Sequence, residues 1–295
     1  MTPANFLERI KSGAVLISDG ATGTNLQQRG LTAGKPGEVW VLERPEEILR
    51  LHRDFIAAGA DIILTCTFGG TSIRLALEGL EDRTAELNQR AADMAKQAVQ
   101  GTTVLVAGSI GPTGQMLKPL GSMEEEDCYK AYEQQARALA QTGVDLLVIE
   151  TQYDLNEAGL AVKAARAVSD LPLICSFSYD RGTRTMMGVK PAQMAKTFAG
   201  QVDLLGINCG KSLEDNLNAL QELRSATDLP LWFKPNAGLP RVDAEGHTVF
   251  DVSPENMAAR VHDWLAAGAS VVGGCCGTSP AHLQEIARAG KGGLA

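Results

Sequence analysis

The sequence predicts an α/β protein: a single (β/α)8 TIM barrel, one domain over residues 1–295. Eight short apolar segments occur along the chain, and each is followed by a segment with helical periodicity. Glycine recurs where a helical segment passes into the next apolar one. Alternating strands and helices of this kind are typical of a parallel sheet covered by helices.

The predicted strands share a nearly continuous run of Val, Ile and Leu, as buried parallel strands do. Their short length separates them from the longer helical segments. The predicted strands are residues 14–19, 61–67, 103–109, 145–150, 172–177, 203–208, 231–234 and 270–274.

The predicted helices carry apolar residues three and four positions apart, which places these residues on one face. In the segment 45–58, that face consists of Ile48, Leu49, His52, Phe55 and Ile56. The predicted helices are residues 45–58, 85–99, 124–141, 156–168, 192–198, 213–225, 254–267 and 280–289.

Four of the junctions from helix to strand contain a glycine: Gly59, Gly143, Gly200 and Gly268. Glycine tolerates the left-handed conformation that often ends a helix, because it has no Cβ. The repeated junction favours the barrel over a doubly wound open sheet. The open sheet normally carries a G-x-G-x-x-G motif after its first strand, and residues 19–24 do not match it.

Composition excludes several function classes. The 27 Lys and Arg against 35 Asp and Glu give a net charge of −8, and no basic stripe suggests a nucleic-acid partner. Apolar segments stay well below the ~18 residues needed to cross a membrane. The N-terminus lacks a basic and then apolar signal pattern, so we expect a cytoplasmic protein.

The six cysteines are too few for a disulfide scaffold in a chain of this length. Cys209 follows the sixth predicted strand, and the adjacent pair Cys275 and Cys276 follows the eighth. Active sites of such barrels lie at the carboxyl ends of the strands, so these cysteines are expected at one rim. Three thiolates with one open position suit a catalytic Zn²⁺ ion.

Adjacent cysteines can bind one ion only if the backbone turns sharply between them, and Gly273, Gly274 and Gly277 supply that freedom. A vicinal disulfide between Cys275 and Cys276 is the alternative, which a reducing cytosol disfavours.

The other cysteines have plainer interpretations. Cys175 is expected in the core of a strand, where cysteine packs as a small apolar residue. Cys128 is expected as a half-buried helix residue, and Cys66 is expected to line the site without binding the metal.

Three thiolates and Zn²⁺ carry a net formal charge of −1. A substrate thiol that joined them would lose its proton and remain electron-rich. Histidine ligands, by contrast, favour the acidification of water for hydrolysis. The chemistry that fits this ligand set is therefore alkylation of a thiol by an activated carbon.

Two carboxylates are expected at the same rim, Asp19 after the first strand and Glu150 after the fourth. No basic residue at a strand end offers a partner, apart from Lys234, so the pair suggests a cationic ligand group such as an ammonium. The alternatives are a turn or cap role for Asp19 and a structural hydrogen bond for Glu150. Backbone N–H groups of residues 20–24 can hold a carboxylate. Together these groups describe a thiol amino acid.

The chain resembles the homocysteine S-methyltransferase family, especially the homocysteine-binding barrel of cobalamin-dependent methionine synthase. The matching motifs run across nearly the whole chain, and the last three, in this order, are highly specific. They are residues 19–24 (DGATGT), 58–65 (AGADIILT), 107–114 (AGSIGPTG), 148–151 (VIET), 206–209 (GINC), 235–238 (PNAG) and 273–278 (GGCCGT).

The resemblance implies zinc bound by Cys209, Cys275 and Cys276, with the homocysteine sulfur in the fourth position and methionine as product. It implies that Asp19 and Glu150 hold the amino group. It also implies that backbone amides near Gly20 and Ala21, and near Thr65 at the end of strand two, take the carboxylate.

The sequence departs from the family pattern at two places. Cys66 stands where the family usually has Asn, so the side-chain amide that the family carries there is missing. Thr22 stands where methionine is frequent.

The methyl donor is not specified by the sequence. Because the chain ends just after the barrel, we expect methylcobalamin on a separate corrinoid protein, or a small molecule such as S-methylmethionine, a betaine or S-adenosylmethionine. The alternatives are methyl transfer to another thiol, a homocysteine-binding subunit that does not turn over alone, and a Schiff-base lyase with Lys234 as nucleophile. Lys234 can equally be a rim residue that orients loops.

Overall fold

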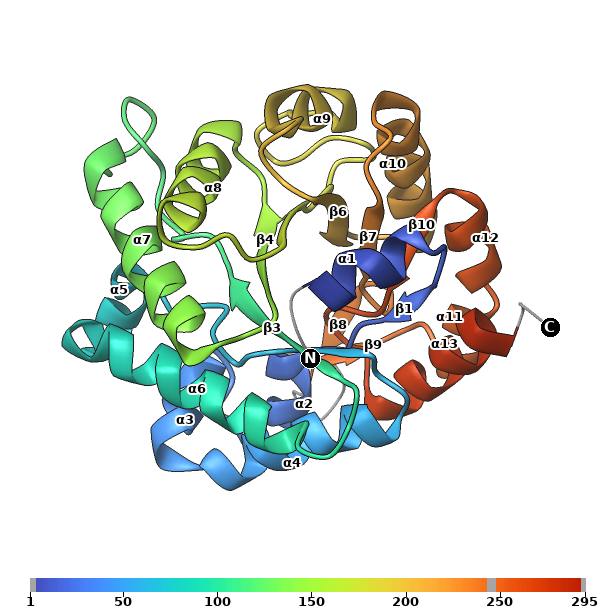
Figure 1. Ribbon diagram of the computed structural model, residues 1–295, viewed down its shortest axis with the longest axis horizontal. Coiled ribbons are helices and arrows are strands. Elements are labelled where there is room, and N and C mark those ends of the chain that lie inside the picture. The colour runs from blue at the N-terminus through green and yellow to red at the C-terminus, as the bar shows by residue number, and fades with distance from the viewer. Residues whose placement is uncertain (1–3, 243–247, 293–295) are drawn as a thin grey trace.

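Eight parallel strands form a barrel in the computed structural model, which describes residues 4–242 and 248–292 (Figure 1). The hydrogen-bonded order is β1-β10-β7-β6-β5-β4-β3-β2, and a parallel bridge between Ser18 and Ile62 joins β1 to β2. The predicted (β/α)8 fold is therefore confirmed. The barrel strands are β1 (Leu16–Ile17), β2 (Ile62–Leu64), β3 (Leu105–Ile110), β4 (Leu146–Gln152), β5 (Leu173–Phe177), β6 (Leu204–Cys209), β7 (Leu231–Pro235) and β10 (Ala269–Val272).

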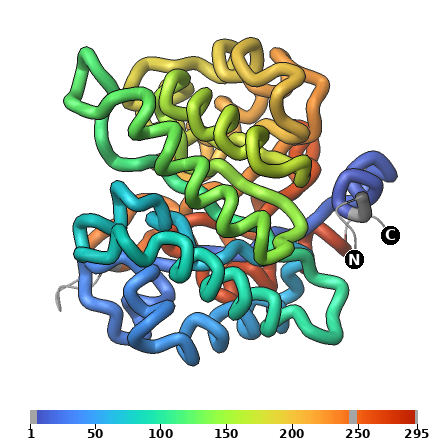
Figure 2. Tube along the Cα trace, turned by 60° about the vertical axis from the view of Figure 1, so that its left-hand side comes forward, coloured from blue at the N-terminus to red at the C-terminus, as the bar shows by residue number. Residues whose placement is uncertain are grey.

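Helices surround the barrel, and Figure 2 shows α6, α7 and α8 following one another around its outside. The main outer helices are α4 (Pro45–Ala57), α6 (Thr84–Ala98), α7 (Glu125–Thr142), α8 (Leu155–Val168), α9 (Pro191–Phe198), α10 (Leu213–Ala226), α11 (Pro254–Ala258), α12 (Val261–Ala266) and α13 (Pro280–Gly292). Shorter helices in the loops are α2 (Thr22–Gln28), η1 (Gly37–Val39), α3 (Trp40–Glu43), α5 (Ser72–Leu75), η2 (Ala76–Glu78) and η3 (Glu81–Arg83).

The apolar core has two parts. One lies between the strands and the outer helices, and the other fills the inside of the barrel. Helix α1 (Ala4–Lys11) lies across one end of the barrel in Figure 1, and its Phe6 and Ile10 pack into the inner core. The amino-terminal end of the barrel is thereby closed, so the open end is the one at which the strands finish.

The glycine junctions have the predicted conformation, with positive φ at Gly59, Gly143, Gly200 and Gly268. The aspartate that follows a junction supports the sheet as well. Asp145 accepts a hydrogen bond from the N–H of Val106 at 2.8 Å. Asp61 and Asp203 accept from Ile17 at 2.9 Å and from Leu173 at 2.8 Å in the same way. Each carboxylate therefore ties the start of its own strand to the preceding strand of the barrel.

The structure differs from the prediction in details. The first two strands, β1 and β2, are shorter than expected. Only their central residues pair with neighbouring strands, and the flanking residues belong to the loops. The expected helix 254–267 is divided into α11 and α12. A small hairpin, β8 (Pro240–Val242) with β9 (Thr248–Phe250), follows β7 and was not predicted, because its strands are short and β8 is exposed.

None of the helices in the described ranges is long and apolar enough to span a bilayer.

Candidate active site

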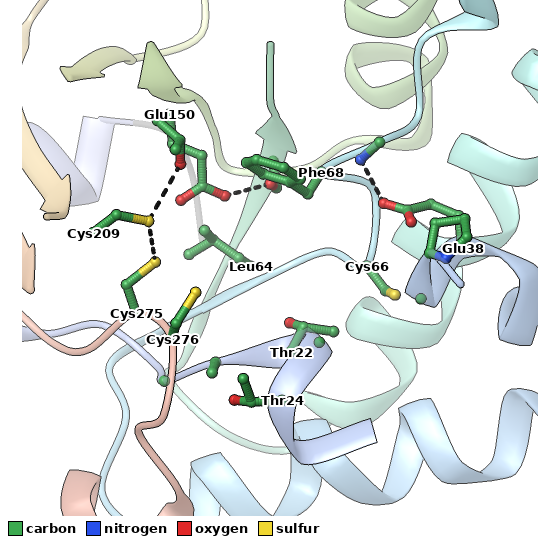
Figure 3. Close-up of a pocket in the computed structure, with 18 of the residues that line it drawn as sticks. Thr22, Thr24, Glu38, Leu64, Cys66, Phe68, Glu150, Cys209, Cys275 and Cys276 are labelled. Atoms are coloured by element: carbon green, nitrogen blue, oxygen red, sulfur yellow. Dashed lines mark hydrogen bonds between the residues drawn. The ribbon is translucent and has the colours of Figure 1, made fainter. Parts of the chain in front are cut away.

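The carboxyl ends of the barrel strands surround a cavity of about 320 Å³ (Figure 3). This is the end at which (β/α)8 enzymes carry their active sites. The lining residues come from segments far apart in the sequence, including the loops after β1 and β2 and the turn after β10. Its ionisable or nucleophilic side chains include Glu38, Cys66, Arg74, Ser109, Glu150, Thr151, Cys209, Lys234, Cys275 and Cys276.

Cys209 is the last residue of β6 and adopts a left-handed backbone conformation with φ of 60°. Gly210 follows with φ of 77°, and a Cβ atom there would overlap Oδ1 of Asn216. The side chain of Asn216 donates to the carbonyl of Cys209 at 2.6 Å. The backbone is therefore held in a tight turn at the point where the Cys209 thiol lines the cavity.

Cys275 and Cys276 lie in the turn after β10. The N–H of Cys275 donates to the carbonyl of Pro235 at 2.9 Å, and the carbonyl of Cys276 accepts from Ala237 at 2.9 Å. Gly277 then takes φ of 81°, a conformation that favours glycine. The N–H of Thr278 closes the turn by donating to the carbonyl of Cys275 at 3.1 Å. Bonds to the last residue of β7 and to the segment after it therefore hold the turn that carries both cysteines.

The Sγ atoms of Cys209, Cys275 and Cys276 lie within 4.8 Å of one another, and those of Cys209 and Cys275 are 2.9 Å apart (Figure 3). Zn–S bonds of about 2.3 Å in a tetrahedron place sulfur atoms about 3.8 Å apart. The three cysteines that the sequence singled out therefore converge, and their spacing is compatible with one zinc ion.

The thiols of the cluster differ in acidity, because they share hydrogen bonds. Hydrogen bonds from Cys209 and Cys275 lower the pKa of Cys276 to about 4. The bond to Cys275 raises the pKa of Cys209 well above its ordinary value. The cluster therefore readily holds one negative charge and resists a second. A bound dication would remove this resistance, because it attracts each thiolate.

The remaining cysteines lie outside the cluster, and all six are free. Cys66 lines the cavity, as predicted, and burial raises its pKa well above the ordinary value. Cys175 is buried in β5, as predicted. Cys128 is fully buried on α7, where a half-buried residue was expected.

Glu150 is a buried carboxyl group in the cavity wall, close to the thiols (Figure 3). The hydroxyl of Ser109 donates to its Oε1 at 2.5 Å. Burial raises the pKa of Glu150 to about 7, although the charge of Lys234 opposes the shift. A carboxyl group with this pKa gains from a cation in the cavity, which would stabilise its charged form.

Asp19 is also buried, but it already has a cationic partner. Nζ of Lys234 donates to its Oδ1 at 2.6 Å, and the N–H of Leu64 donates to its Oδ2 at 2.8 Å. Asp19 and the nearby Glu150 raise the pKa of Lys234 despite its burial. From the sequence, Lys234 was the one basic residue at a strand end that could pair with Asp19. The structure shows that Lys234 is that partner and lies inside the barrel, 2% exposed, rather than on the rim.

The residues expected near the substrate carboxylate, Gly20, Ala21 and Thr65, all line the cavity. The N–H of Ala21 already donates to Thr278, and that of Thr65 donates to the carbonyl of Ala107. Ala21 and Thr65 therefore shape the wall with their amides engaged in the fold.

The end of the cavity near Glu38 was missed by the sequence analysis. Glu38 is a buried residue of η1, and its Oε1 accepts from the N–H of Gly69 at 2.5 Å. Burial raises the pKa of Glu38, and the charge of Arg74 lowers it. Phe68 and Cys66 line the same region (Figure 3). No periodic pattern in the sequence points to Glu38, because it lies in a loop between short helices.

Comparison with known proteins identifies the family. A family profile described as "Homocysteine S-methyltransferase" matches residues 16–290. The chain belongs to the homocysteine S-methyltransferase family. This membership confirms the predicted resemblance.

Among the curated relatives of this family member are two mycobacterial methionine synthases. The protein of Mycobacterium leprae (strain TN) is 31% identical over 293 residues, which cover 93% of this chain and 24% of the relative. That of Mycobacterium tuberculosis (strain ATCC 25618 / H37Rv) is 31% identical over 298 residues, covering 95% and 25%. The chain thus spans only about a quarter of these relatives.

Solved structures similar to this homocysteine S-methyltransferase family member include the homocysteine methyltransferase MmuM from Escherichia coli. Its metallated form has a TM-score of 0.81 and 28% identity, and the match covers 97% of this chain and 99% of that one. Its oxidized form has a TM-score of 0.77 and 29% identity, and the match covers 92% of this chain and 94% of that one. The carboxyl transferase domain of Rhizobium etli pyruvate carboxylase, at 14% identity and a TM-score of 0.55, shares the fold alone.

Proposed function

We propose that this protein is a zinc-dependent homocysteine S-methyltransferase that transfers a methyl group to the homocysteine thiolate and forms methionine. The observation that carries the proposal is the convergence of Cys209, Cys275 and Cys276 in one cavity with Glu150. Thiolates suit zinc, and a carboxyl group beside them suits the ammonium of an amino acid. Family membership supplies the reaction class.

The three cysteines would hold the ion through their Sγ atoms, leaving one position open. When bound there, zinc would take the substrate thiol and remove its proton, so that no separate general base is needed. Cys209 comes from β6, and Cys275 and Cys276 from the turn after β10, so the barrel itself fixes their spacing. Holding the sulfur and the methyl carbon in line would lower the barrier further.

Glu150 would receive the substrate ammonium, with Ser109 fixing the orientation of the carboxylate. Asp19 was expected to share this role, and its bonds to Lys234 and Leu64 favour an indirect contribution through the charge balance of the pocket. Gly20, Ala21 and Thr65 would form the wall beside the substrate carboxylate.

The methyl donor would be methylcobalamin on a separate corrinoid protein or a small onium compound. One feature of the surface favours a protein donor. The exposed large apolar side chains of the described residues all lie in segments that follow the carboxyl ends of strands β2, β3, β5 and β7. They are Leu77, Met116, Leu120, Met186, Leu239, Val242 and Val249.

The Schiff-base alternative meets an obstacle in the ion pair of Lys234. A lysine must lose its proton to attack a carbonyl group, and the raised pKa of Lys234 keeps it protonated. Borohydride trapping with carbonyl substrates should therefore yield no adduct at Lys234.

The proposal is tested by adding homocysteine to reduced, zinc-loaded protein and following the metal by X-ray absorption. We expect about one zinc with three sulfur ligands, and a fourth when homocysteine is added. Methionine formation is then measured with S-methylmethionine, S-adenosylmethionine, a betaine and methylcobalamin in turn. Other thiols tested in place of homocysteine determine whether the acceptor is specific. Failure to bind zinc after anaerobic reconstitution would overturn the thiolate mechanism.

A further inference from the structure

The side chain of Asn208 joins three neighbouring strand ends beside the thiol cluster. Asn208 precedes Cys209 in β6 and is fully buried. Its Oδ1 accepts from the hydroxyl of Ser176 in β5 at 2.7 Å and from the N–H of Thr151 in β4 at 2.9 Å. Its Nδ2 donates to the hydroxyl of Thr151 at 2.7 Å. One carboxamide therefore links β4, β5 and β6.

The same Nδ2 atom faces the sulfur atoms. It lies 3.5 Å from Sγ of Cys209 and 3.9 Å from Sγ of Cys275. An amide nitrogen carries two hydrogens, so one can serve the hydroxyl of Thr151 and the other the two sulfurs. A bond from N–H to a charged acceptor is stronger than one to a neutral acceptor. The hydrogen bonds from Nδ2 of Asn208 are therefore strongest when these sulfurs are thiolates.

The backbone around Asn208 is also unusual. Within residues 4–242 and 248–292, Thr151 and Cys209 are the two non-glycine residues with positive φ, and both have φ of 60°. The hydroxyl of Thr151 is 3.8 Å from Sγ of Cys209. Such strain persists only where the surroundings hold it, and it gathers at functional sites. Asn208 contacts both strained residues.

We propose that Asn208 is a positioning residue that fixes the Cys209 thiolate and donates its N–H to the sulfurs of Cys209 and Cys275, setting their affinity for the metal. The inference rests on the proposed zinc site and adds a residue to which neither the sequence nor the family match assigns a role. Aspartate would keep the acceptor oxygen for Ser176 and Thr151 but would lose the donor and add a negative charge. The proposed role of Asn208 therefore depends on the N–H groups of its carboxamide, which an aspartate of the same shape lacks.

The test compares Asn208→Asp with a matched control, Asn88→Asp. Asn88 is also fully buried, and its Nδ2 donates to the carbonyls of Gly70 and Thr84, away from the sulfurs. Zinc affinity is measured by competition with a chelator, and cobalt-substituted protein reports the sulfur-to-metal charge-transfer bands. We expect Asn208→Asp to lose about 10- to 100-fold in zinc affinity and to shift these bands. We expect Asn88→Asp to change neither.

Equal losses in both variants, or unchanged affinity and bands in Asn208→Asp, would overturn the proposal. Should Asn208→Asp fold poorly, Ser176→Ala removes one support of Oδ1 and leaves the donor in place. It should shift the bands in the same direction by a smaller amount, and unchanged bands would again count against Asn208.

A measurement on metal-free protein separates this inference from the proposed function. The rate at which each cysteine is alkylated is measured by peptide mapping. In Asn208→Asp we expect the alkylation rate of Cys209 to change severalfold, because the amide nitrogen that lies 3.5 Å from its sulfur has been removed. Cys66 should be alkylated at the same rate in Asn208→Asp as in the wild-type protein. A wild-type protein that binds no zinc would refute the proposed function, whereas an unchanged rate at Cys209 would refute the role of Asn208.

Discussion

Lys234 and Asp19 form an ion pair inside the barrel, with Nζ 2.6 Å from Oδ1 and both side chains almost fully buried. The two residues come from β7 and from the end of β1, and β10 lies between these strands. A buried carboxylate next to a thiolate cluster is unfavourable unless a cation compensates it. The ion pair neutralises Asp19 inside the pocket. Glu150, which also lines the cavity, forms no ion pair with any residue that the structure describes.

Removing the lysine should destabilise the fold. Lys234→Met leaves the Asp19 carboxylate buried without its partner, which typically costs about 3–5 kcal/mol in the free energy of unfolding. Urea denaturation monitored by circular dichroism measures this loss. Lys130→Met is the control, because Lys130 pairs with Glu126 on the surface and should change stability by less than about 1 kcal/mol. Adding Asp19→Asn to Lys234→Met should recover part of the loss, and a double variant no more stable than the single one would contradict the assignment.

Alanine substitution of each clustered cysteine should release the metal. Cys209→Ala, Cys275→Ala and Cys276→Ala each remove one sulfur from a three-sulfur site, so zinc content after dialysis should fall well below one equivalent. Elemental analysis measures it. Cys66→Ala removes a thiol from the same cavity but outside the cluster and should keep its zinc. Full retention of zinc by any one of the three variants would exclude that cysteine as a ligand.

Binding of the amino acid should depend on the ionisation of Glu150. Methionine is the suitable probe, because it carries an ammonium and no ionisable thiol. The pKa of Glu150 is about 7, and only its carboxylate form attracts an ammonium. Affinity for methionine, measured by calorimetry, should therefore rise about tenfold between about pH 6 and pH 8.

The variant Glu150→Gln should bind methionine about tenfold or more weakly at the higher pH and lose the pH dependence, with zinc content unchanged. The same shift affects stability. Because the folded pKa of Glu150 lies above its unfolded value of 4.5, the unfolded state loses this proton first as the pH rises. The contribution of Glu150 to the free energy of unfolding therefore falls between about pH 4.5 and pH 7 and stays low above that range. A pH profile of methionine binding that persists in Glu150→Gln would show that another group is responsible.

The turn at Gly210 should be more sensitive than other left-handed turns. Gly210→Ala places a Cβ atom against Asn216, which holds the carbonyl of Cys209. Gly200→Ala is the matched control, because Gly200 has a similar φ of 73° and open space around it. Both should lose about 1 kcal/mol from the backbone conformation. Only Gly210→Ala should lose more stability and weaken zinc binding, and equal effects would show that packing against Asn216 is unimportant.

The helices and strands could largely be predicted from the sequence. The eight apolar runs and the glycines at positions 59, 143, 200 and 268 depend on local periodicity and local backbone preference, and the structure bears them out. The hairpin after β7 and the division of the helix 254–267 could not be predicted, because short exposed elements leave no periodic pattern.

The sequence by itself determined the barrel and the meeting of Cys209 with Cys275 and Cys276. The reason is geometric: parallel strands in a barrel finish at the same end, so residues placed after them must gather there. Only the tertiary structure decided the partner of Asp19, the contacts of Asn208 and the presence of Glu38 in the cavity. These contacts depend on side-chain directions across strands and loops that are distant in the sequence, and no local pattern encodes them.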